Sequence, residues 1–308
     1  MSEMNTPTPK TPGRLYRMWD SDIAYSFRKS PLAIVSGVVA LTIVLAAVFA
    51  PLIAPTNPYD PSGLNLMDGF SRPMQENAFT GNTFLLGADN QGRDVLSTIL
   101  YGARISLFVG FSAVLFAMIL GITAGLLAGY RGGWVDALLM RIADVQLSFP
   151  SILIALLIFG VARGFIPPSQ RETVAIGLSD WVQFARVVRG ATMVEKGKEY
   201  VQAARVIGVH PVRILLRHIL PNVMGPVLVI GTIGLALAII AEATLSFLGV
   251  GVPPTQPSLG TLIRIGQQYL FSGEWWILLF PAVTLLALAL AVNLLGDWLR
   301  DALNPRLR

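Results

Sequence analysis

Two long runs without a single charged side chain, Leu32–Ile53 and Ile105–Tyr130, constrain the fold of this chain more than any other feature. About twenty consecutive apolar residues are enough for one helix to cross the hydrocarbon core of a bilayer. Only 13% of the 308 residues are charged, whereas soluble domains carry about 25%. The mean hydropathy is +0.63. The chain is therefore predicted to fold in a membrane.

Four further apolar segments complete a predicted set of six transmembrane helices. Some of these segments contain polar interruptions: Asp144 and Pro150 in the third span, Asp180 in the fourth and Glu242 in the fifth. The predicted spans are Leu32–Ile53, Ile105–Tyr130, about Leu138–Val161, about Thr173–Val188, Val223–Leu248 and Trp275–Leu295. The expected fold class is all-α, a polytopic membrane protein with six transmembrane helices.

The distribution of Lys and Arg predicts the orientation in the membrane. With the N-terminus inside, seventeen basic residues lie in cytoplasmic segments and six lie outside, the bias that cytoplasmic loops of membrane proteins show. Residues 1–30 are then a cytoplasmic tail, and residues 31–104 hold the first transmembrane helix and an extracytoplasmic loop. Residues 105–308 form a core of five transmembrane helices with a cytoplasmic loop at 195–222. Both termini are expected in the cytoplasm.

Several function classes are disfavoured by composition. The chain has no Cys and only two His, so a zinc site is improbable. The net charge of +5 is spread over short segments between helices, which fits membrane topology better than binding to nucleic acid. A nucleotide-binding loop needs G-x-x-x-x-G-K, and the one Gly-Lys pair, Gly197–Lys198, has Thr192 in place of the first Gly. No catalytic constellation is predicted.

The cytoplasmic segment Glu195–Asn222 is a charged island between apolar segments. Its spacing predicts a helix over Lys198–Val209, a turn at Gly208, and a second helix that begins near Pro211. The first helix is expected to present one apolar stripe, and the second a face opposite Arg213 and Arg217. The stripe comprises Tyr200, Ala203, Ala204 and Ile207, and the second face Val212, Leu215, Leu216 and Ile219. Pro221 and Asn222 are expected to break the helix before the fifth span.

The pattern leaves two interpretations of the island open. It is either an interfacial hairpin that covers the bundle or a docking surface for another protein. The run Gln202–Gly208, followed by Leu220–Pro221, resembles the EAA loop of bacterial ATP-binding-cassette importer permeases. That resemblance implies a coupling helix that fits a groove of a cytoplasmic ATPase. Gln202 stands where the family usually has Glu, and His218 where it has Ile. The implied coupling residues are Glu199, Gln202, Ala203, Ala204, Gly208, Leu220 and Pro221.

Three other stretches resemble the dipeptide and oligopeptide permease group: Leu85–Gly110, Ala241–Gly260 and Asn293–Leu307. The extra span Leu32–Ile53 and the tail Met1–Ser30 resemble the C-type subunit of those importers. The resemblance implies the permease fold of type I importers, in the bacterial inner membrane. It also implies a homologous permease, two ATPase subunits that bind the ATP, and an extracytoplasmic binding protein as partners. The substrate would be a di- or oligopeptide. Related permeases carry nickel, glutathione or other small solutes, and a self-sufficient channel or secondary transporter is a further alternative.

Three acidic residues fall at predicted membrane depth. Such groups are costly there and usually face the bundle interior or a water-filled cavity. Asp180 and Glu242 are candidates for the translocation path, whereas Asp144 is expected to bond to a neighbouring helix near the cytoplasmic end. His210 and His218 are predicted to be surface or packing residues, with a pH-sensing role as the alternative. The polar run from Asp89 to Asp94 does not match a calcium-binding loop and predicts a turn and a helix cap.

Overall fold

The computed structural model describes residues 22–60, 63–251, 256 and 258–303. In this part of the chain the regular structure is helical, apart from three isolated β-bridges in the loop before α5. Most of the predicted tail, together with Arg306 and Arg308, lies outside the described residues. The α-helices are α2 (Asp22–Lys29), α3 (Pro31–Val48), α4 (Ala50–Ile53), α5 (Val95–Arg131), α6 (Gly133–Leu147), α7 (Ser151–Ala162), α8 (Pro168–Lys196), α9 (Glu199–Val206), α10 (Pro211–Ile214), α11 (Leu220–Phe247), α12 (Leu259–Tyr269) and α13 (Trp276–Ala302).

Four helices of the described chain are long and apolar enough to cross a membrane. They are α3, α5, the continuous helix Pro211–Phe247 that contains α10 and α11, and α13. The pair α6 and α7 adds a fifth candidate if it is counted as one broken span. Helix α8 has 29 residues but is less apolar than these helices, because charged residues occur along its length. The predicted number of six spans is therefore not confirmed, whereas the all-helical membrane fold is.

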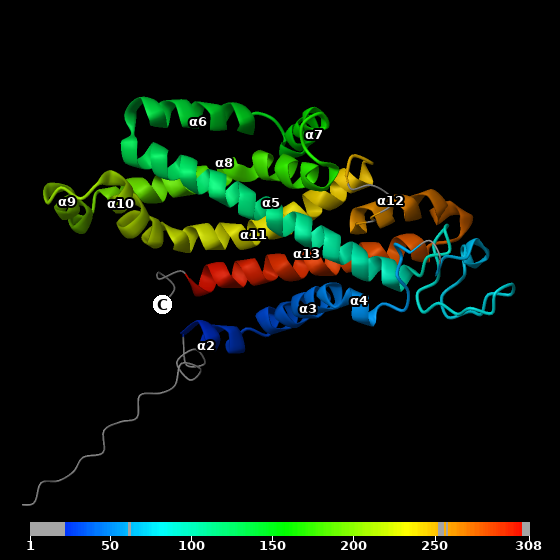
Figure 1. The fold of residues 1–308 in the computed structure, drawn as a ribbon. Coiled ribbons are helices and arrows are strands. Elements are labelled where there is room, and N and C mark those ends of the chain that lie inside the picture. Colours follow the sequence, from blue (N-terminus) through cyan, green and yellow to red (C-terminus); the bar gives the residue numbers. More distant parts are fainter. Residues whose placement is uncertain (1–21, 61–62, 252–255, 257, 304–308) are drawn as a thin grey trace, which may run out of the picture.

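The third predicted span, Leu138–Val161, is not one straight helix. Helices α6 and α7 are bent by 100° at a break over residues 148–150. Pro150 explains the break, because its ring disfavours helical backbone at Phe149 and it has no N–H to donate. Its own backbone is extended, with φ −57° and ψ 132°. Figure 1 shows α7 running across the direction of α6.

Helices α5 and α8 approach closely along a row of small residues, Gly121, Gly125 and Gly129. A Cβ added at Gly125 would lie 2.5 Å from the carbonyl oxygen of Ala185. At Gly129 it would lie 2.8 Å from the carbonyl oxygen of Arg189. Only hydrogen at these positions lets the two backbones meet. The predicted role of the three glycines in helix packing is confirmed.

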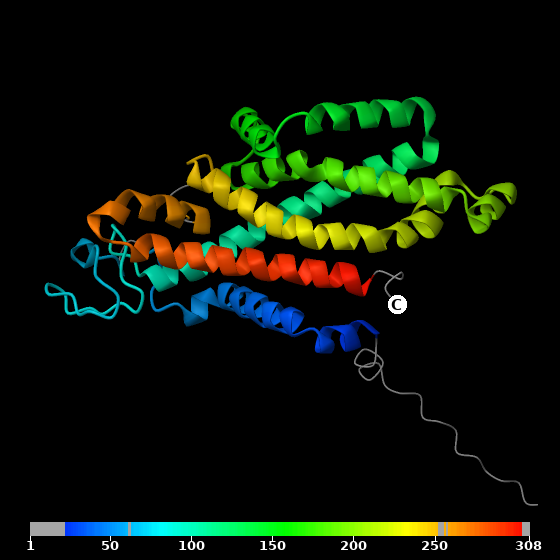
Figure 2. The same ribbon diagram turned by 180° about the vertical axis from the view of Figure 1, so that it is seen from behind.

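Segments that are predicted to lie on the same side of the membrane lie at the same end of the helical bundle (Figures 1 and 2). Helices α9 and α10 share one end with α2 and the last turns of α13, where the rings of Phe27 and Trp298 lie 5.1 Å apart. The loop before α5 and helix α12 lie at the opposite end. There Trp276 Nε1 donates to the carbonyl of Ala88 at 3.2 Å.

Turns and caps in the loop before α5 fix its conformation. Arg93 Nε bonds to Asp89 Oδ2 at 2.6 Å, with both side chains almost fully buried. Asp94 is the N-cap of α5 and accepts the Ser97 N–H at 2.8 Å, which satisfies one of the free donors of the first turn. The predicted turn and helix cap over Asp89 to Asp94 are confirmed.

Candidate functional site

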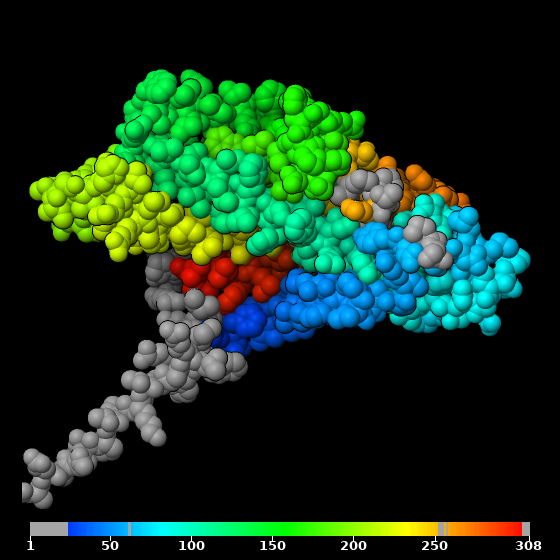
Figure 3. Space-filling view, in the orientation of Figure 1, coloured from blue at the N-terminus to red at the C-terminus, as the bar shows by residue number. Residues whose placement is uncertain are grey.

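The Glu195–Asn222 segment folds as a helical hairpin that projects from one end of the molecule (Figures 1 and 3). Val201 and Ala204 of α9 are buried with Ile214 and Ile219 in one apolar cluster, which also contains Phe184 of α8. The cluster connects the hairpin to α8 and to the start of α11. The hairpin is therefore continuous with the bundle core and packs against both long helices.

Of the apolar stripe predicted for the first helix, Tyr200, Ala203 and Ile207 are exposed, as a face presented to another protein would be, whereas Ala204 is buried. The buried face of α9 consists of Val201 and Ala204. Helix α9 has only 8 residues with apolar side chains on most sides, so spacing alone does not select the buried face. Packing against α8 and the second helix selects it.

Gly208 ends α9 as predicted, with φ +78°. The Gly208 N–H donates to the carbonyl of Arg205, and the Val209 N–H donates to the carbonyl of Ala204, both at 3.0 Å. This pair of bonds is the Schellman motif, which favours glycine at the left-handed position. The motif fixes the direction in which the chain turns toward Pro211, so the two helices of the hairpin have a defined angle.

The expected break at Pro221 and Asn222 is wrong. After α10 the chain makes a π-helical turn, Leu215–Ile219, and continues as one helix to Phe247. Pro221 has no N–H, and in a regular α-helix its ring would clash with the carbonyl four residues earlier. The wider π turn, in which the Leu220 N–H donates to the Leu215 carbonyl, accommodates it.

The π turn also changes which side chains of the second helix face inward. Ile214 and Ile219, five residues apart, are fully buried. Val212 and Leu216 are exposed, although the spacing predicted them on one face with the buried Ile219. His210 caps the helix, since its Nδ1 accepts the Val212 N–H at 3.4 Å.

Tyr200 links the three helices that meet at the base of the hairpin, a role that the sequence did not reveal. Its hydroxyl donates to the carboxylate of Glu195 in α8 and accepts from Asn222 Nδ2 of α11 at 3.0 Å. Burial and the hydrogen bond to Glu195 raise the pKa of the Tyr200 phenol to about 12, so it remains a donor at neutral pH. Lys198 holds the other Glu195 oxygen at 2.7 Å.

The outward face of α9 is apolar. Val206 is 87% exposed and Ile207 is 78% exposed, next to the exposed Ala203. We call these three residues the α9 ridge. Such exposure at the tip of a projecting element is typical of a surface that another protein covers.

The other predicted coupling residues lie around this ridge in different environments. Glu199 is exposed in the first turn of α9. The side chain of Gln202 donates from Nε2 to the Gly197 carbonyl at 2.9 Å, a bond that the usual glutamate would not donate. Leu220 is half-buried and Pro221 exposed at the start of α11. Ala204 belongs to the buried cluster.

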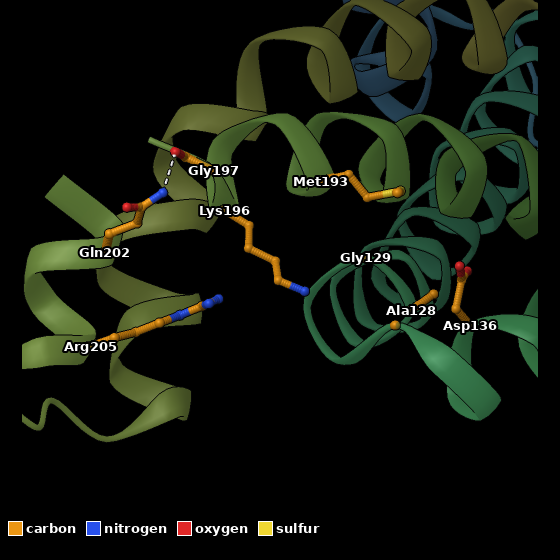
Figure 4. Close-up of a pocket in the computed structure, with 9 residues that line it drawn as sticks. Ala128, Gly129, Asp136, Met193, Lys196, Gly197, Gln202 and Arg205 are labelled. Carbon is orange, nitrogen blue, oxygen red and sulfur yellow. Dashed lines mark hydrogen bonds between the residues drawn. The ribbon is translucent and has the colours of Figure 1, made fainter. Parts of the chain in front are cut away.

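A pocket of about 370 Å³ opens beside the hairpin, between the ends of α5 and α8, the start of α6 and α9. Figure 4 shows Lys196 and Arg205 extending into it. Lys196 Nζ donates to the Tyr130 carbonyl at 2.6 Å, and the Arg205 guanidinium lies 4.9 Å from the centre of the Tyr130 ring. These contacts attach the hairpin to the end of α5.

The three acidic residues at predicted membrane depth differ in their surroundings. Asp144 of α6 pairs with Arg186 of α8 at 2.5 Å, so the expected bond to a neighbouring helix is confirmed. Asp180 is half-buried and accepts from Ser179 Oγ at 3.3 Å. The carboxylate of Glu242 is fully buried and accepts from Ser246 Oγ at 2.9 Å.

The described residues include no group of three or more His, Cys, Asp or Glu side chains that could hold a metal ion. The hairpin itself combines a fixed turn, a buried root in two long helices and an exposed apolar ridge.

Comparison with known proteins shows to which protein family this chain belongs. The family of binding-protein-dependent transport system inner membrane components matches residues 121–308. The N-terminal transmembrane domain of oligopeptide transport permease C matches residues 18–73. The chain therefore belongs to the binding-protein-dependent transport family. It is a multi-pass inner membrane permease component of an ATP-binding-cassette transporter and not its ATPase.

Relatives similar along the full length refine this placement. The dipeptide transport system permease protein of Alkalihalophilus pseudofirmus is 36% identical over 306 residues, covering 99% of this chain and 96% of that protein. The oligopeptide transport system permease protein of Bacillus subtilis is 37% identical over 292 residues, covering 94% and 90%. An inward-facing structure of the MetNI methionine ABC transporter aligns with a TM-score of 0.55 at 22% identity, over 67% of this chain and 96% of that one. That likeness supports the fold.

Proposed function

We propose that this chain is one permease subunit of an ATP-driven importer of di- or oligopeptides. The names of its relatives support the substrate class, since dipeptide, di/tripeptide and oligopeptide permeases are all 36% to 37% identical to it over most of its length. A substrate-binding protein delivers the peptide at the end that carries the loop before α5. The two ATPase subunits bind at the opposite end, where both termini lie in the cytoplasm.

The α9 ridge is the observation that carries this proposal. Ala203, Val206 and Ile207 place apolar side chains at the tip of a projecting helix, where water would otherwise surround them. A groove on an ATPase subunit would cover them, which is the helix-in-groove mode of recognition. Movement of the ATPases would then pull on α9, and the contacts of Tyr200 would pass that movement to α8 and α11.

Helix α8 is proposed as the sixth span despite its charges. Its 29 residues extend about 43 Å at 1.5 Å per residue, more than the hydrocarbon core of about 30 Å. Two of its arginines, Arg186 and Arg189, are paired with aspartates of α6. A second, homologous permease would pack against this part of the molecule, because α6 buries only Ala143 in this chain.

Substitution of Ile207 tests the docking surface. Ile207→Asp places a charge in the apolar contact without filling any space inside the hairpin, because Ile207 is exposed. The expected result is loss of ATPase subunits on co-purification and loss of peptide uptake, with normal abundance of the permease. Phe271→Asp is the matched control, since Phe271 is 97% exposed at the opposite end.

Gly208→Trp is a second test of the same surface. The Gly208 position has no neighbour within 4 Å but requires a positive φ, so Trp both strains the turn and projects into the contact. If the ATPases remain bound and uptake continues in both variants, the coupling role of the hairpin is wrong.

A further inference from the structure

A groove of about 840 Å³ opens between α3 and the first half of α5. Val44 and Val48 of α3 line it together with Phe108 and Phe111 of α5, and α11 contributes Leu235. Figure 1 shows the two helices converging toward the end of the molecule that carries the loop before α5. We call this feature the α3–α5 groove.

The apolar part of the groove is open at the surface. Phe108 and Phe111 are 68% and 60% exposed, and Val48 is 55% exposed. All three belong to charge-free runs that are long enough to cross the hydrocarbon core. An exposed apolar surface at this depth is covered by acyl chains or by another apolar protein surface.

The groove becomes polar at one end, where Tyr59, Tyr101 and Arg104 line it. Arg104 is the last charged residue before the charge-free run that starts at Ile105. Tyrosine side chains are enriched at the level of lipid headgroups. The sequence boundary at Arg104 and the two tyrosines therefore assign the polar end to the same depth, at the edge of the hydrocarbon.

The tyrosine pair is held in place by contacts on both sides. The rings of Tyr59 and Tyr101 lie edge to face, with their centres 5.1 Å apart. The backbone N–H and the hydroxyl of Thr56 lie 3.1 and 3.2 Å from Ser97 Oγ, which ties the segment before Tyr59 to α5. The Tyr59 N–H donates to Asn57 Oδ1 at 3.1 Å. The polar end is therefore a built part of the fold.

Positive charge is available at this end. The Arg104 side chain is exposed and takes part in none of the ion pairs among the described residues. No acidic residue of the described chain lines the groove. Burial raises the pKa of the Tyr59 phenol, whereas the charge of Arg104 acts to lower it. The Tyr59 hydroxyl is thus a hydrogen-bond donor at neutral pH, near the guanidinium.

These groups match the parts of a phospholipid. A guanidinium is suited to phosphate, because its planar set of N–H donors can make two parallel bonds to phosphate oxygens. The groove extends along α5 from Tyr101 to Phe111, ten residues or about 15 Å. That length is comparable to one leaflet, which is half of a hydrocarbon core of about 30 Å.

The second permease is proposed to cover a different side of the molecule. Figures 1 and 2 both show α6, against which it would pack, on the far side of α5 from α3. A partner on α6 leaves the α3–α5 groove facing the bilayer. Lipid is then the neighbour that supplies both the apolar chain and the negative charge that the groove requires.

We propose that the α3–α5 groove binds one anionic phospholipid, with its phosphate at Arg104 and the tyrosine hydroxyls and one acyl chain between α3 and α5. A zwitterionic headgroup fits less well, because it brings its own cation close to Arg104. The bound lipid fills the space between α3 and the core, and so stabilises the position of α3. This inference is independent of the solute that the importer carries.

Charge removal tests the headgroup contact in the purified, assembled importer. Binding of phosphatidylglycerol is measured by native mass spectrometry. Arg104→Gln should lower the affinity by about tenfold or more, the effect of losing a charge-assisted hydrogen bond. Arg72→Gln, at an exposed arginine in the loop before α5, should leave the affinity unchanged. Equal affinities of the wild type and Arg104→Gln would overturn the proposal.

Filling the groove tests the site of the acyl chain. Val48→Trp places a large ring in the groove and should also weaken binding of phosphatidylglycerol. Val38→Trp is the matched control, because Val38 is 59% exposed on the same helix but does not line the groove. If both variants bind the lipid as the wild type does, the acyl chain does not lie there.

Soluble probes separate a lipid from a free anion. Inorganic phosphate and glycerophosphoglycerol carry the phosphate without an acyl chain, and neither should displace phosphatidylglycerol. Displacement by either probe would show a plain anion site and contradict the lipid assignment. Phosphatidylcholine should bind more weakly than phosphatidylglycerol, and equal binding of the two would contradict the preference for an anionic headgroup.

Photochemical labelling decides the proposal even if the variants fail to assemble. Phosphatidylglycerol with a diazirine in its acyl chain is added to the unmodified importer in lipid nanodiscs, and the labelled peptides are sequenced. Residues 44–48 and 105–111 should be labelled more strongly than the surface of α13 around Leu286, which is 66% exposed. Equal labelling of the groove and of α13 would mean bulk lipid only. A benzophenone introduced at Phe108 should attach to lipid, whereas attachment to the second permease would show that protein covers the groove.

Discussion

Tyr200 of α9 donates its hydroxyl hydrogen to the carboxylate of Glu195 in α8. The same hydroxyl accepts from Asn222 of α11, so one oxygen connects α9, the proposed docking helix, with the two long helices α8 and α11. Apolar packing alone would allow the hairpin to rotate about its root. The three bonded groups fix its angle.

Tyr200→Phe removes this junction and keeps the ring. The expected loss of stability is small, about 1 kcal/mol, because water can reach the site. Uptake should fall more than ATP hydrolysis, since the ATPases still bind the unchanged α9 ridge but move a looser hairpin. The measurement is the number of ATP molecules hydrolysed per peptide transported. Tyr269→Phe, at the opposite end, is the control and should keep the wild-type ratio.

Gly125→Ala is expected to destabilise the contact between α5 and α8. The new Cβ would lie 2.5 Å from the Ala185 carbonyl oxygen, so the helices must separate, at a cost of about 1–3 kcal/mol. The same substitution at Gly160, where no neighbour lies within 4 Å, should be neutral or slightly stabilising because Ala favours helix. Thermal unfolding in detergent, followed by size-exclusion chromatography, compares the two. Equal melting temperatures would contradict the close packing.

Arg93→Met should destabilise the loop before α5. It keeps the apolar volume but leaves the Asp89 carboxylate buried without its ion partner, a change that costs about 3–5 kcal/mol when a buried pair is broken. Asp89 keeps two backbone donors, the N–H groups of Gln91 and Arg93, so the lower value is expected. Adding Asp89→Asn should recover part of the loss by removing the charge. Arg72→Met, at an exposed position, is the control for thermal unfolding.

Ser246→Ala should destabilise the interior near the start of α12. Ser246 Oγ bonds to Glu242 at 2.9 Å and lies 3.2 Å from Glu172, and neither carboxylate is open to water. Loss of the hydroxyl leaves buried carboxylate oxygen without that partner, with an expected cost of about 1–3 kcal/mol. Thr244→Ala in the same helix removes an exposed hydroxyl bonded to its own helix. If both variants unfold at the same temperature, the buried bond contributes nothing.

Spans that bury only apolar groups were predictable from local pattern. The charge-free runs at Leu32–Ile53 and Ile105–Tyr130 correspond to α3 with α4 and to most of α5, because hydrocarbon requires apolar side chains whatever the neighbours are. Helix α8 could not be assessed in this way. Two of its charged side chains, Arg186 and Arg189, pair with aspartates of α6, and those partners are not adjacent in sequence.

In the candidate site, too, local features were predictable from the sequence and long-range contacts were not. The turn at Gly208 was predictable, because a glycine, which readily adopts the left-handed conformation, followed three residues later by Pro211 is a local sequence signal. The buried face of α9 was not, nor was the continuation of the helix through Pro221. Both depend on contacts with α8 and on a π turn that shifts the inward face by one residue. The role of Tyr200 in linking α8, α9 and α11 could not be predicted, because no sequence pattern marks it beyond its position five residues after Glu195.

The sequence by itself determined the membrane environment, the positions of the long helices, the glycine row of α5 and the end of α9, since each follows from interactions within a few turns of chain. The tertiary structure decided which side chains meet. It set α6 beside α8 so that Asp144 reaches Arg186, and it turned Val201 inward so that Ile207 remains outside. Long-range pairing depends on the angles between helices, and these are fixed only when all the faces pack together.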